Sequence, residues 1–206
     1  MHAMKIASRA AVAAMLAAIT PLARADDLVG DVRTIMLVRD DNNYFTHATK
    51  FGYDFPNVAG GIMGTLGVAL GPRVTVLGEG FYALDGADRG DARIRLASGA
   101  LLGVVRASLA RAQDKTVLTE LAVLGGFGRY YVKETYVDPD LSPMVYSTST
   151  GSFGGVAGLE ASIAAGAFRA VIGYGYHYAP ATVDDRVRGS VDAGGHEVSF
   201  GIGVRL

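Results

Sequence analysis

The chain has 206 residues, a net charge of −1 and no cysteine. The lack of cysteine excludes a disulfide framework, a thiolate metal site and a lipidated cysteine anchor. The near-neutral charge, without a basic patch, predicts no nucleic-acid partner. Half of the residues are hydrophobic, which is too many for a disordered chain despite 28 glycines, so one folded domain is expected.

Residues 1–25 have the features of a secretory signal peptide. They combine a positively charged start, an apolar stretch from Ala10 to Ile19 and a small-x-small cleavage site that ends at Ala25. The apolar stretch is too short to cross a bilayer as a helix. The sequence therefore predicts cleavage after Ala25, export from the cytoplasm and a mature domain of residues 26–206.

Eight segments follow in which apolar residues alternate with small or charged ones, which is the period of a half-buried strand. They lie roughly at 31–40, 60–70, 73–84, 92–107, 116–134, 152–165, 168–179 and 195–206. Several exceed the usual strand length in globular proteins, whereas a strand tilted across a bilayer needs about 9–11 residues. We find no helical period and no second domain.

The connections between these segments alternate between short and long. The short ones are 71–72, 110–115 and 165–167, and the others, mostly longer and polar, are 41–59, 85–91, 135–151 and 180–194. An up-and-down meander with short turns at one rim and longer loops at the other is typical of a bacterial outer-membrane barrel.

The last segment, HEVSFGIGVRL, shows which face should meet water. Val198, Phe200 and Ile202 share one face, and small or charged residues occupy the other. Across the segments this second face carries one or two charges among Gly, Ala and Ser, which suits the cramped interior of an eight-stranded barrel better than a water-exposed exterior. We therefore predict that the apolar face contacts lipid; a soluble, lipocalin-like barrel would reverse both faces.

Closure follows from the same argument, because lipid offers no hydrogen-bond partner to a free strand edge. The terminal segment should therefore pair with the first. Aromatic residues gather toward the long-loop ends of the segments, as an interfacial belt would. They are Tyr82, Phe127, Tyr130, Tyr131, Phe153, Tyr174, Tyr176 and Tyr178.

These features resemble the small eight-stranded outer-membrane β-barrel family, which includes OmpA, OmpX and OmpW-like proteins. The resemblance implies an all-β, closed, antiparallel, up-and-down, transmembrane barrel in the outer membrane of a Gram-negative bacterium. Outer-membrane lipids and lipopolysaccharide would surround it, and the outer-membrane assembly machinery would recognise its C-terminal strand. The family usually ends in Phe or Trp, whereas this chain ends in Leu206, a departure that affects the expected efficiency of assembly more than the fold.

The inward-facing charges form the first candidate site, because unpaired carboxylates in a narrow lumen are unfavourable and should find arginine partners. The predicted ion-pair network comprises Arg73, Glu79, Arg93, Arg95, Glu120, Glu160, Glu197 and Arg205. One interpretation is a structural network that fills the lumen. The alternative is a porin-like gate whose pairs exchange partners and admit ions or small solutes.

The first long loop, 41–59, is rich in aromatic residues and forms the second candidate site. Exposed rings in a surface loop indicate a patch that binds an extracellular ligand. The alternative is that the rings cap the mouth of the barrel. The residues concerned are Tyr44, Phe45, Phe51, Tyr53 and Phe55.

His177 could form a lipid-hydrolase site with Ser162 or Ser199, but the surrounding GYGYHYAP has no recognisable catalytic motif. The aspartates near the loops 41–59 and 135–151 lack the oxygen-ligand spacing of a dedicated calcium site. We therefore expect no catalytic residue, no cofactor and no metal. The expected function is a structural or surface-interaction role, with a narrow pore as the alternative and a lipid-modifying enzyme as the weaker one.

Overall fold

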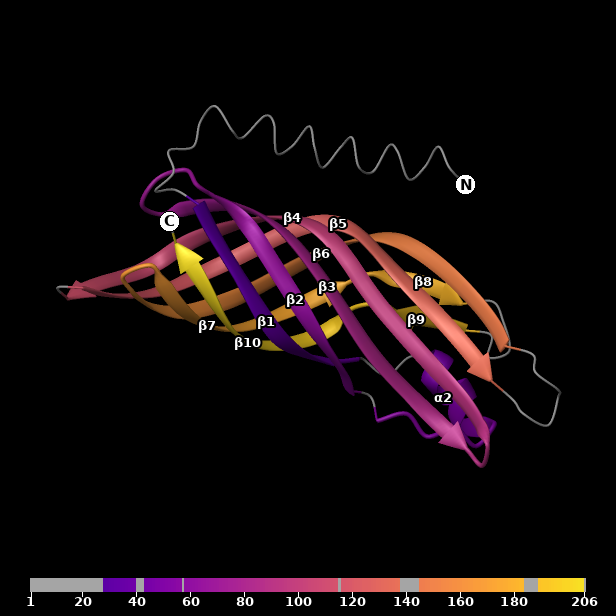
Figure 1. The fold of residues 1–206 in the computed structure, drawn as a ribbon. Helices are drawn as coiled ribbons and strands as arrows, with labels where there is room; N and C mark the ends of the chain where they lie inside the picture. The colour runs from indigo at the N-terminus through magenta and orange to yellow at the C-terminus, as the bar shows by residue number, and fades with distance from the viewer. Residues whose placement is uncertain are drawn as a thin grey trace.

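The computed structural model describes residues 28–39, 43–56, 58–114, 116–137, 145–183 and 189–205. The predicted signal peptide, the aspartates at 40, 41, 138 and 140, and Leu206 lie outside these residues. In the described chain, eight long antiparallel strands close into one barrel (Figure 1). The closed, up-and-down, eight-stranded fold predicted from the sequence is therefore confirmed.

Each barrel strand overlaps one of the eight predicted segments. The strands are β1 (Leu28–Val38), β2 (Val58–Ala69), β3 (Val74–Arg89), β4 (Ala92–Asp114), β5 (Val117–Val137), β6 (Val145–Ala165), β7 (Phe168–Tyr178) and β10 (Gly195–Arg205). A helix, α2 (Asn43–Lys50), and a small hairpin of β8 (Pro180–Val183) and β9 (Gly189–Asp192) lie in two of the connections. The helix was not predicted, because its eight residues are too few to show a clear helical period.

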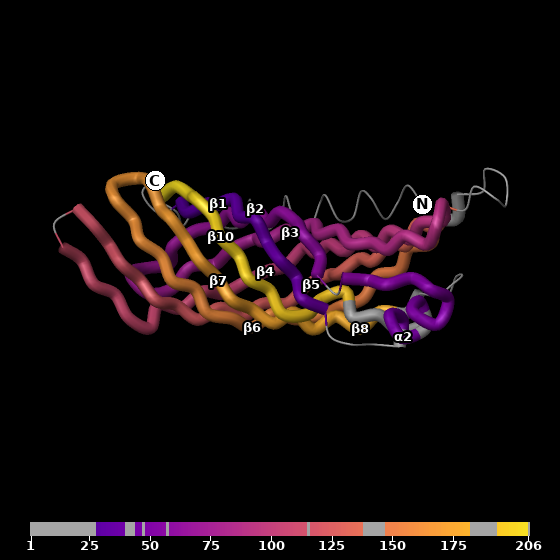
Figure 2. The backbone as a smooth tube through the Cα atoms, turned by 90° about the horizontal axis from the view of Figure 1, so that it is seen from below, coloured from indigo at the N-terminus to yellow at the C-terminus, as the bar shows by residue number. Residues whose placement is uncertain are grey.

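The terminal strand closes the barrel as predicted. β10 pairs with β1 from Val29 opposite Arg205 to Val38 opposite His196, so both edges of the meander are satisfied. The first and last described residues lie at one end of the barrel, which we call the terminal end. The opposite end carries α2 and the β8–β9 hairpin (Figure 2) and is called the loop end.

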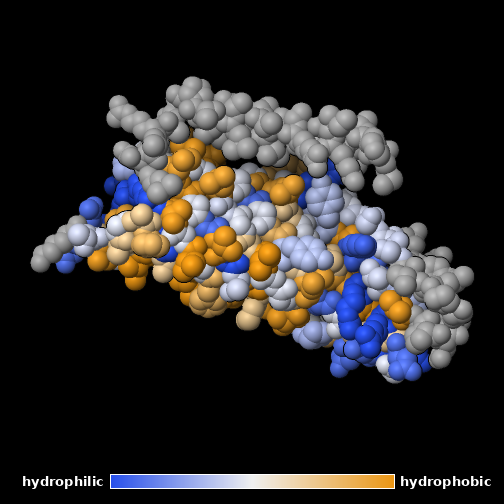
Figure 3. Space-filling model, in the orientation of Figure 1, coloured by the Kyte–Doolittle hydropathy of each residue, from blue (hydrophilic) through white to orange (hydrophobic). Residues whose placement is uncertain are grey.

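The orientation of the two faces is also as predicted. On β10, Phe200 and Ile202 are 51% and 74% exposed, whereas Glu160 on β6 is 1% exposed inside the barrel. Apolar side chains cover most of the visible wall, and hydrophilic ones gather at the loop end over β3 and β4 (Figure 3). The lipocalin-like orientation is therefore excluded. The described residues contain no helix long and apolar enough to cross a membrane.

Three strands are much longer than a bilayer requires. β4, β5 and β6 have 23, 21 and 21 residues, about twice that length, and β4 and β6 also extend well past their predicted segments. The segments expected as loops at 85–91 and around 110–115 are therefore mostly paired strand. The β3–β4 hairpin turns at Gly90, whose φ of 58° is a left-handed conformation that glycine adopts without strain.

Most of the predicted aromatic belt faces outward. Tyr82, Phe127, Tyr131, Phe153, Tyr174 and Tyr178 are exposed large side chains. Tyr130 is the exception, because it is fully buried in the lumen. Successive residues of a strand point to opposite faces, so Tyr130 and Tyr131 cannot both belong to the belt.

Candidate functional site: the lumen and its mouth

The terminal half of the lumen contains a set of charged side chains from five strands. β1 contributes an aspartate and an arginine, and β4, β5, β6 and β7 contribute one charged residue each. All are buried because their positions share the inward phase of the strands. We call this set the terminal charge network: Asp31, Arg33, Arg106, Glu120, Glu160 and Arg169.

Glu160 is the centre of this network. Its Oε2 accepts a hydrogen bond from Arg33 Nη2 at 2.6 Å, and its Oε1 lies 2.7 Å from Arg106 Nε. The same Oε1 accepts a hydrogen bond from Arg169 Nη2. One carboxylate therefore holds three guanidinium groups from β1, β4 and β7.

Asp31 and Glu120 supply the remaining negative charges. Asp31 accepts hydrogen bonds from Arg33 Nε at 2.6 Å and from Arg169 Nη1 at 3.1 Å. Glu120 Oε2 accepts one from Arg106 Nη2 at 2.7 Å. The network's three arginines are thus balanced by three carboxylates, as buried charges require.

Only part of the predicted ion-pair network belongs to this set. Glu120 and Glu160 are members, and Arg205 lines the cavity at the terminal mouth together with Glu120. Glu79 and Glu197 are buried in the middle of the lumen instead. The arginines that pair with the carboxylates, Arg33, Arg106 and Arg169, were missed, and so was Asp31. On β1 Asp31 and Arg33 share the inward face with Ile35 and Leu37, so the sequence of this segment does not separate an apolar face from a charged one.

Three predicted members are wrong. Arg73 precedes β3 and is exposed, and Arg93 and Arg95 are exposed on the outer face of β4. Their neighbours Ile94 and Leu96 are fully buried in the lumen. Further along β4 the large apolar side chains Leu101 and Val105 are exposed on the outer face, so the distribution of apolar residues between the two faces changes along this strand.

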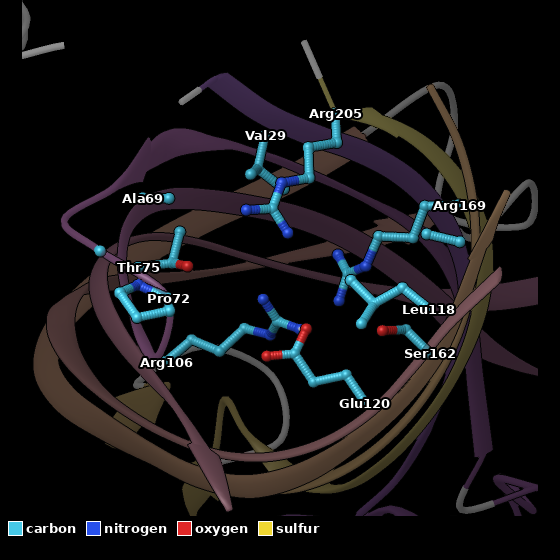
Figure 4. A pocket seen from close by; sticks show the side chains of 12 residues that line it. Val29, Ala69, Pro72, Thr75, Arg106, Leu118, Glu120, Ser162, Arg169 and Arg205 are labelled. Carbon is cyan, nitrogen blue, oxygen red and sulfur yellow. The ribbon is translucent and has the colours of Figure 1, made fainter. Parts of the chain in front are cut away.

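The terminal mouth contains a cavity of about 20 Å³ (Figure 4). Arg106 and Glu120 point toward one another across its floor, and the Arg205 guanidinium points in from the rim. Ser162 and Thr75 add hydroxyl groups to the lining. A volume of this size has room for about one water molecule.

A second polar group lies in the middle of the lumen. His177 Nδ1 is 2.9 Å from the Tyr130 hydroxyl, and its Nε2 is 2.7 Å from Glu197 Oε2. The Tyr130 hydroxyl also donates to the Gly155 carbonyl oxygen at 3.2 Å, so it links the imidazole to the backbone of β6. The Phe81 ring packs edge-on against the imidazole at 5.2 Å, and a cavity of about 10 Å³ adjoins His177 and Glu79.

This geometry does not support a hydrolase. Both ring nitrogens of His177 are occupied by Tyr130 and Glu197, and the ring is buried rather than at the rim. Neither Ser162 nor Ser199 is among its hydrogen-bond partners in the described chain. Within the described ranges of the chain, no cluster of three or more His, Asp or Glu side chains is placed to hold a metal ion.

The loop half of the lumen is mainly apolar around the buried charged residues Arg39, Asp85 and Glu134. Arg39 Nε donates to Asp85 Oδ2 at 2.7 Å and its Nη2 donates to Ser98 at 2.8 Å. Buried aliphatic side chains from β1, β2, β3, β4 and β5 surround this pair. They include Leu37, Ala59, Ala83, Ala87, Ile94, Leu96 and Val132.

The first long loop folds over this apolar end. Tyr44 and Phe45 from α2 are buried and contact Phe55, with ring centroids 5.3 to 5.9 Å apart. Tyr53 is also buried and packs against Tyr136 of β5. We call Tyr44, Phe45, Tyr53 and Phe55 the mouth cap.

The mouth cap corrects the predicted binding patch. Of the five predicted rings, only Phe51 is exposed, at 54%. The other four bury apolar area against the barrel mouth, which agrees with the alternative of a cap. Burial, with the Glu134 carboxylate nearby, raises the pKa of the Tyr44 hydroxyl, so that it stays protonated in the cap.

Comparison with known proteins identifies the fold. No protein family and no curated protein matches the chain in sequence. Two crystal structures of Ail, the attachment invasion locus protein of Yersinia pestis, match at 12% identity with TM-scores of 0.53 and 0.52. They cover 87% and 88% of this chain and 97% and 99% of Ail, and one contains the heparin analogue sucrose octasulfate.

Neisserial surface protein A is a further match, with 10% identity and a TM-score of 0.45 over 89% of this chain and 98% of that protein. The likeness to Ail extends over nearly the whole barrel. It shows that the chain has the fold of a small eight-stranded outer-membrane β-barrel.

Proposed function

We propose that the chain is an outer-membrane β-barrel with a closed lumen that acts through surface interactions at its loop end. The apolar wall and the satisfied strand edges support a position in lipid. With the predicted export signal, the terminal end faces the periplasm and the loop end faces the exterior. Outer-membrane lipids, lipopolysaccharide and the assembly machinery are its partners in this position.

The filled lumen is the observation that carries this proposal. The terminal charge network, the His177 group and the mouth cap follow one another along the barrel axis. The cavities at the terminal mouth and beside His177 measure about 20 and 10 Å³, each of the order of a single water molecule. Such a lumen offers no path for a solute, and the binding surface must lie outside it.

Conductance measurements test the closed lumen. We expect refolded protein in planar bilayers to show no reproducible current steps. The variant Tyr44→Ala/Phe55→Ala removes two of the four mouth cap rings. Its lumen should stay closed, because the terminal charge network still fills the terminal half of the barrel. Regular steps from the unmodified protein would instead support the narrow pore.

The projecting hairpins are the natural surface for interaction. β3 and β4 stay paired as far as Arg89 opposite Ala92 and present charged side chains near their tip. Ail was crystallised with a heparin analogue, which supports sulfated polysaccharide as a first ligand to try. Bacteria that display the chain should bind immobilised heparin more than control cells do.

A shortened hairpin provides the matched comparison. Residues 88–93 can be replaced by Asn-Gly, because Ala87 and Ile94 are paired and a two-residue turn suits a hairpin. The variant should fold and lose most of the binding. Equal binding by both proteins would refute a role for this hairpin.

We also infer that the protein is not an enzyme, because His177 is fully engaged within the lumen. Expression should leave the acylation pattern of lipid A unchanged, both for the unmodified protein and for His177→Ala. A change that depends on His177 would contradict this inference.

A further inference from the structure

Arg129 lies on the outer, lipid-facing side of the barrel, where a charged group is unexpected. Its guanidinium carbon is 5.4 Å from the centre of the Tyr131 ring and 5.9 Å from that of Phe153. Both rings belong to the exposed aromatic belt, and Phe153 also stacks on Phe127. Arg129 is therefore held within the belt on the outer face of β5.

This position indicates the depth of the guanidinium in the membrane. A charged side chain on a barrel wall is strongly unfavourable at the bilayer midplane but tolerated near the interface, where aromatic belts lie. A long arginine side chain can also direct its charged end toward the headgroups. Arg129 thus presents its charge among the headgroups of the outer leaflet.

The same face continues with further cations toward the loop end. Lys133 lies four residues along β5, roughly 14 Å away at about 3.4 Å per residue. On the neighbouring strand Arg95 is opposite Thr135, and Arg93 is opposite Val137. All of these cationic side chains point away from the lumen. We call Arg93, Arg95, Arg129 and Lys133 the basic wall.

Hydroxyl groups surround the basic wall. Thr135 on β5 and Ser147 and Ser149 on β6 occupy adjacent outward positions, with Lys133 directly opposite Ser149. Asp88 is an acidic residue on the outward face between the aromatic belt and the β3–β4 turn. Its Oδ1 already accepts a hydrogen bond from Arg95 Nη1 at 2.8 Å. The surface therefore combines excess positive charge with hydrogen-bonding groups suited to a sugar.

The charge is confined to one side of the barrel. The outward positions of β1, β2, β7 and β10 contain no Lys, Arg, Asp or Glu among the described residues. They carry residues such as Met36, Ile62, Tyr174 and Val198. These strands end below Lys133, because β7 pairs with β6 only as far as Gly155 and β2 pairs with β3 only as far as Leu84. At the height of Lys133 the comparison is therefore with the outward positions of β6, which carry Ser147 and Ser149, so the cations are concentrated on β4 and β5.

We propose that the basic wall binds the phosphorylated disaccharide headgroup of an outer-leaflet glycolipid, namely lipid A. Lipid A carries phosphates at the two ends of a disaccharide, and Arg129 and Lys133 provide two cationic points separated along one face. Arginine binds phosphate through paired N–H groups and lysine as a point charge. The position of Arg129 within the belt favours a membrane lipid over a soluble anion. This proposal rests on the outer-membrane location proposed above.

Native mass spectrometry of the refolded protein in detergent tests the proposal. With bisphosphorylated lipid A as the probe, we expect a bound complex whose affinity falls at least tenfold in Arg129→Gln/Lys133→Gln, because two charge-assisted contacts are lost. The matched control is Arg73→Gln/Arg111→Gln, which removes two exposed arginines at the terminal end and should bind as the unmodified protein does.

The lipid probe can be varied in the same way. Dephosphorylated lipid A should bind the unmodified protein about as weakly as bisphosphorylated lipid A binds the basic-wall variant. Equal affinity for both lipids, or equal loss in the control variant, would overturn the proposal. Binding of soluble heparin through the basic wall, without binding of lipid A, would also overturn it in favour of an extracellular polysaccharide.

Heat-modifiable gel mobility in the outer-membrane fraction separates this proposal from the proposed function. A protein absent from that fraction would contradict the location itself. A protein that is present and folded there, but whose lipid A affinity does not depend on the basic wall, would contradict only the lipid site.

Discussion

The two ends of the lumen are closed by different means. The terminal charge network draws its six side chains from five strands, so it can form only when the barrel has closed. The mouth cap comes from one connection between β1 and β2 and rests on an apolar surface that the strands already provide. The network is therefore part of the barrel's global stability, whereas the cap can open locally while the barrel stays intact.

Substitution of Glu160 should have the largest effect. Glu160→Gln leaves Arg33, Arg106 and Arg169 with too little negative charge in a buried site, and loss of one partner from such a group costs about 3–5 kcal/mol. We expect the free energy of unfolding, measured in urea with lipid vesicles, to fall by about this amount.

Two neighbours provide a graded comparison for Glu160. Glu120→Gln removes a carboxylate that pairs with Arg106 alone, so its effect should be smaller. Ser162→Ala, on the same face of β6, should cost less than about 1 kcal/mol. If all three variants unfold at the same urea concentration, the terminal charge network does not contribute to the global stability of the barrel.

The mouth cap should respond locally. Phe55→Ala removes a buried ring, a change that costs about 3–5 kcal/mol in a core, although here it should lower the free energy of opening the cap rather than that of the whole barrel. Hydrogen exchange should accelerate in residues 43–56, while heat-modifiable mobility persists. Phe51→Ala, at an exposed ring, is the control and should change neither measurement.

A smaller effect is expected in the middle of the lumen. Tyr130→Phe removes the hydroxyl that contacts His177 Nδ1 and the Gly155 carbonyl oxygen, and each such hydrogen bond contributes about 1 kcal/mol. Tyr131→Phe makes the same chemical change on the outer face one residue later. The urea midpoint should shift for the inner tyrosine only, and equal shifts would show that the lumenal contact is not the cause.

The sequence predicted the faces of the strands because the two-residue period is local and needs no knowledge of the fold. It did not predict the pairing, because Glu160 meets Arg33 from a strand 127 residues away. It also failed where the environment changes along one strand. The rule that small and charged residues face inward assigned Arg93 and Arg95 of β4 to the lumen, whereas at this end of the strand Ile94 and Leu96 face inward and the two arginines face outward.

The fold-back of the first loop could not be read from its composition. A loop with five aromatic rings fits an exposed patch and a cap equally well in sequence. The choice depends on the apolar surface at the loop end. Leu37 of β1 and Ile94 and Leu96 of β4 form this surface only after β2 and β3 have paired between those two strands. The four rings of the mouth cap then pack against this apolar surface.

The exposed ion pair on the projecting hairpin should show the smallest effect. Arg95 Nη1 donates to Asp88 Oδ1 at 2.8 Å, and this hydrogen bond lowers the pKa of the Asp88 carboxyl below its ordinary value of 3.8. A lowered pKa stabilises the folded state above that value, and the contribution is lost as the pH falls through the folded-state pKa. Both groups are in water, unlike the paired charges of the lumen, so Asp88→Asn should leave the urea midpoint unchanged at neutral pH. NMR titration of the Asp88 carboxyl should show the lowered pKa, and its return to the ordinary value in Arg95→Gln would attribute the shift to this pair. A loss of stability comparable to that of Glu160→Gln would mean that solvent exposure does not separate the two kinds of ion pair.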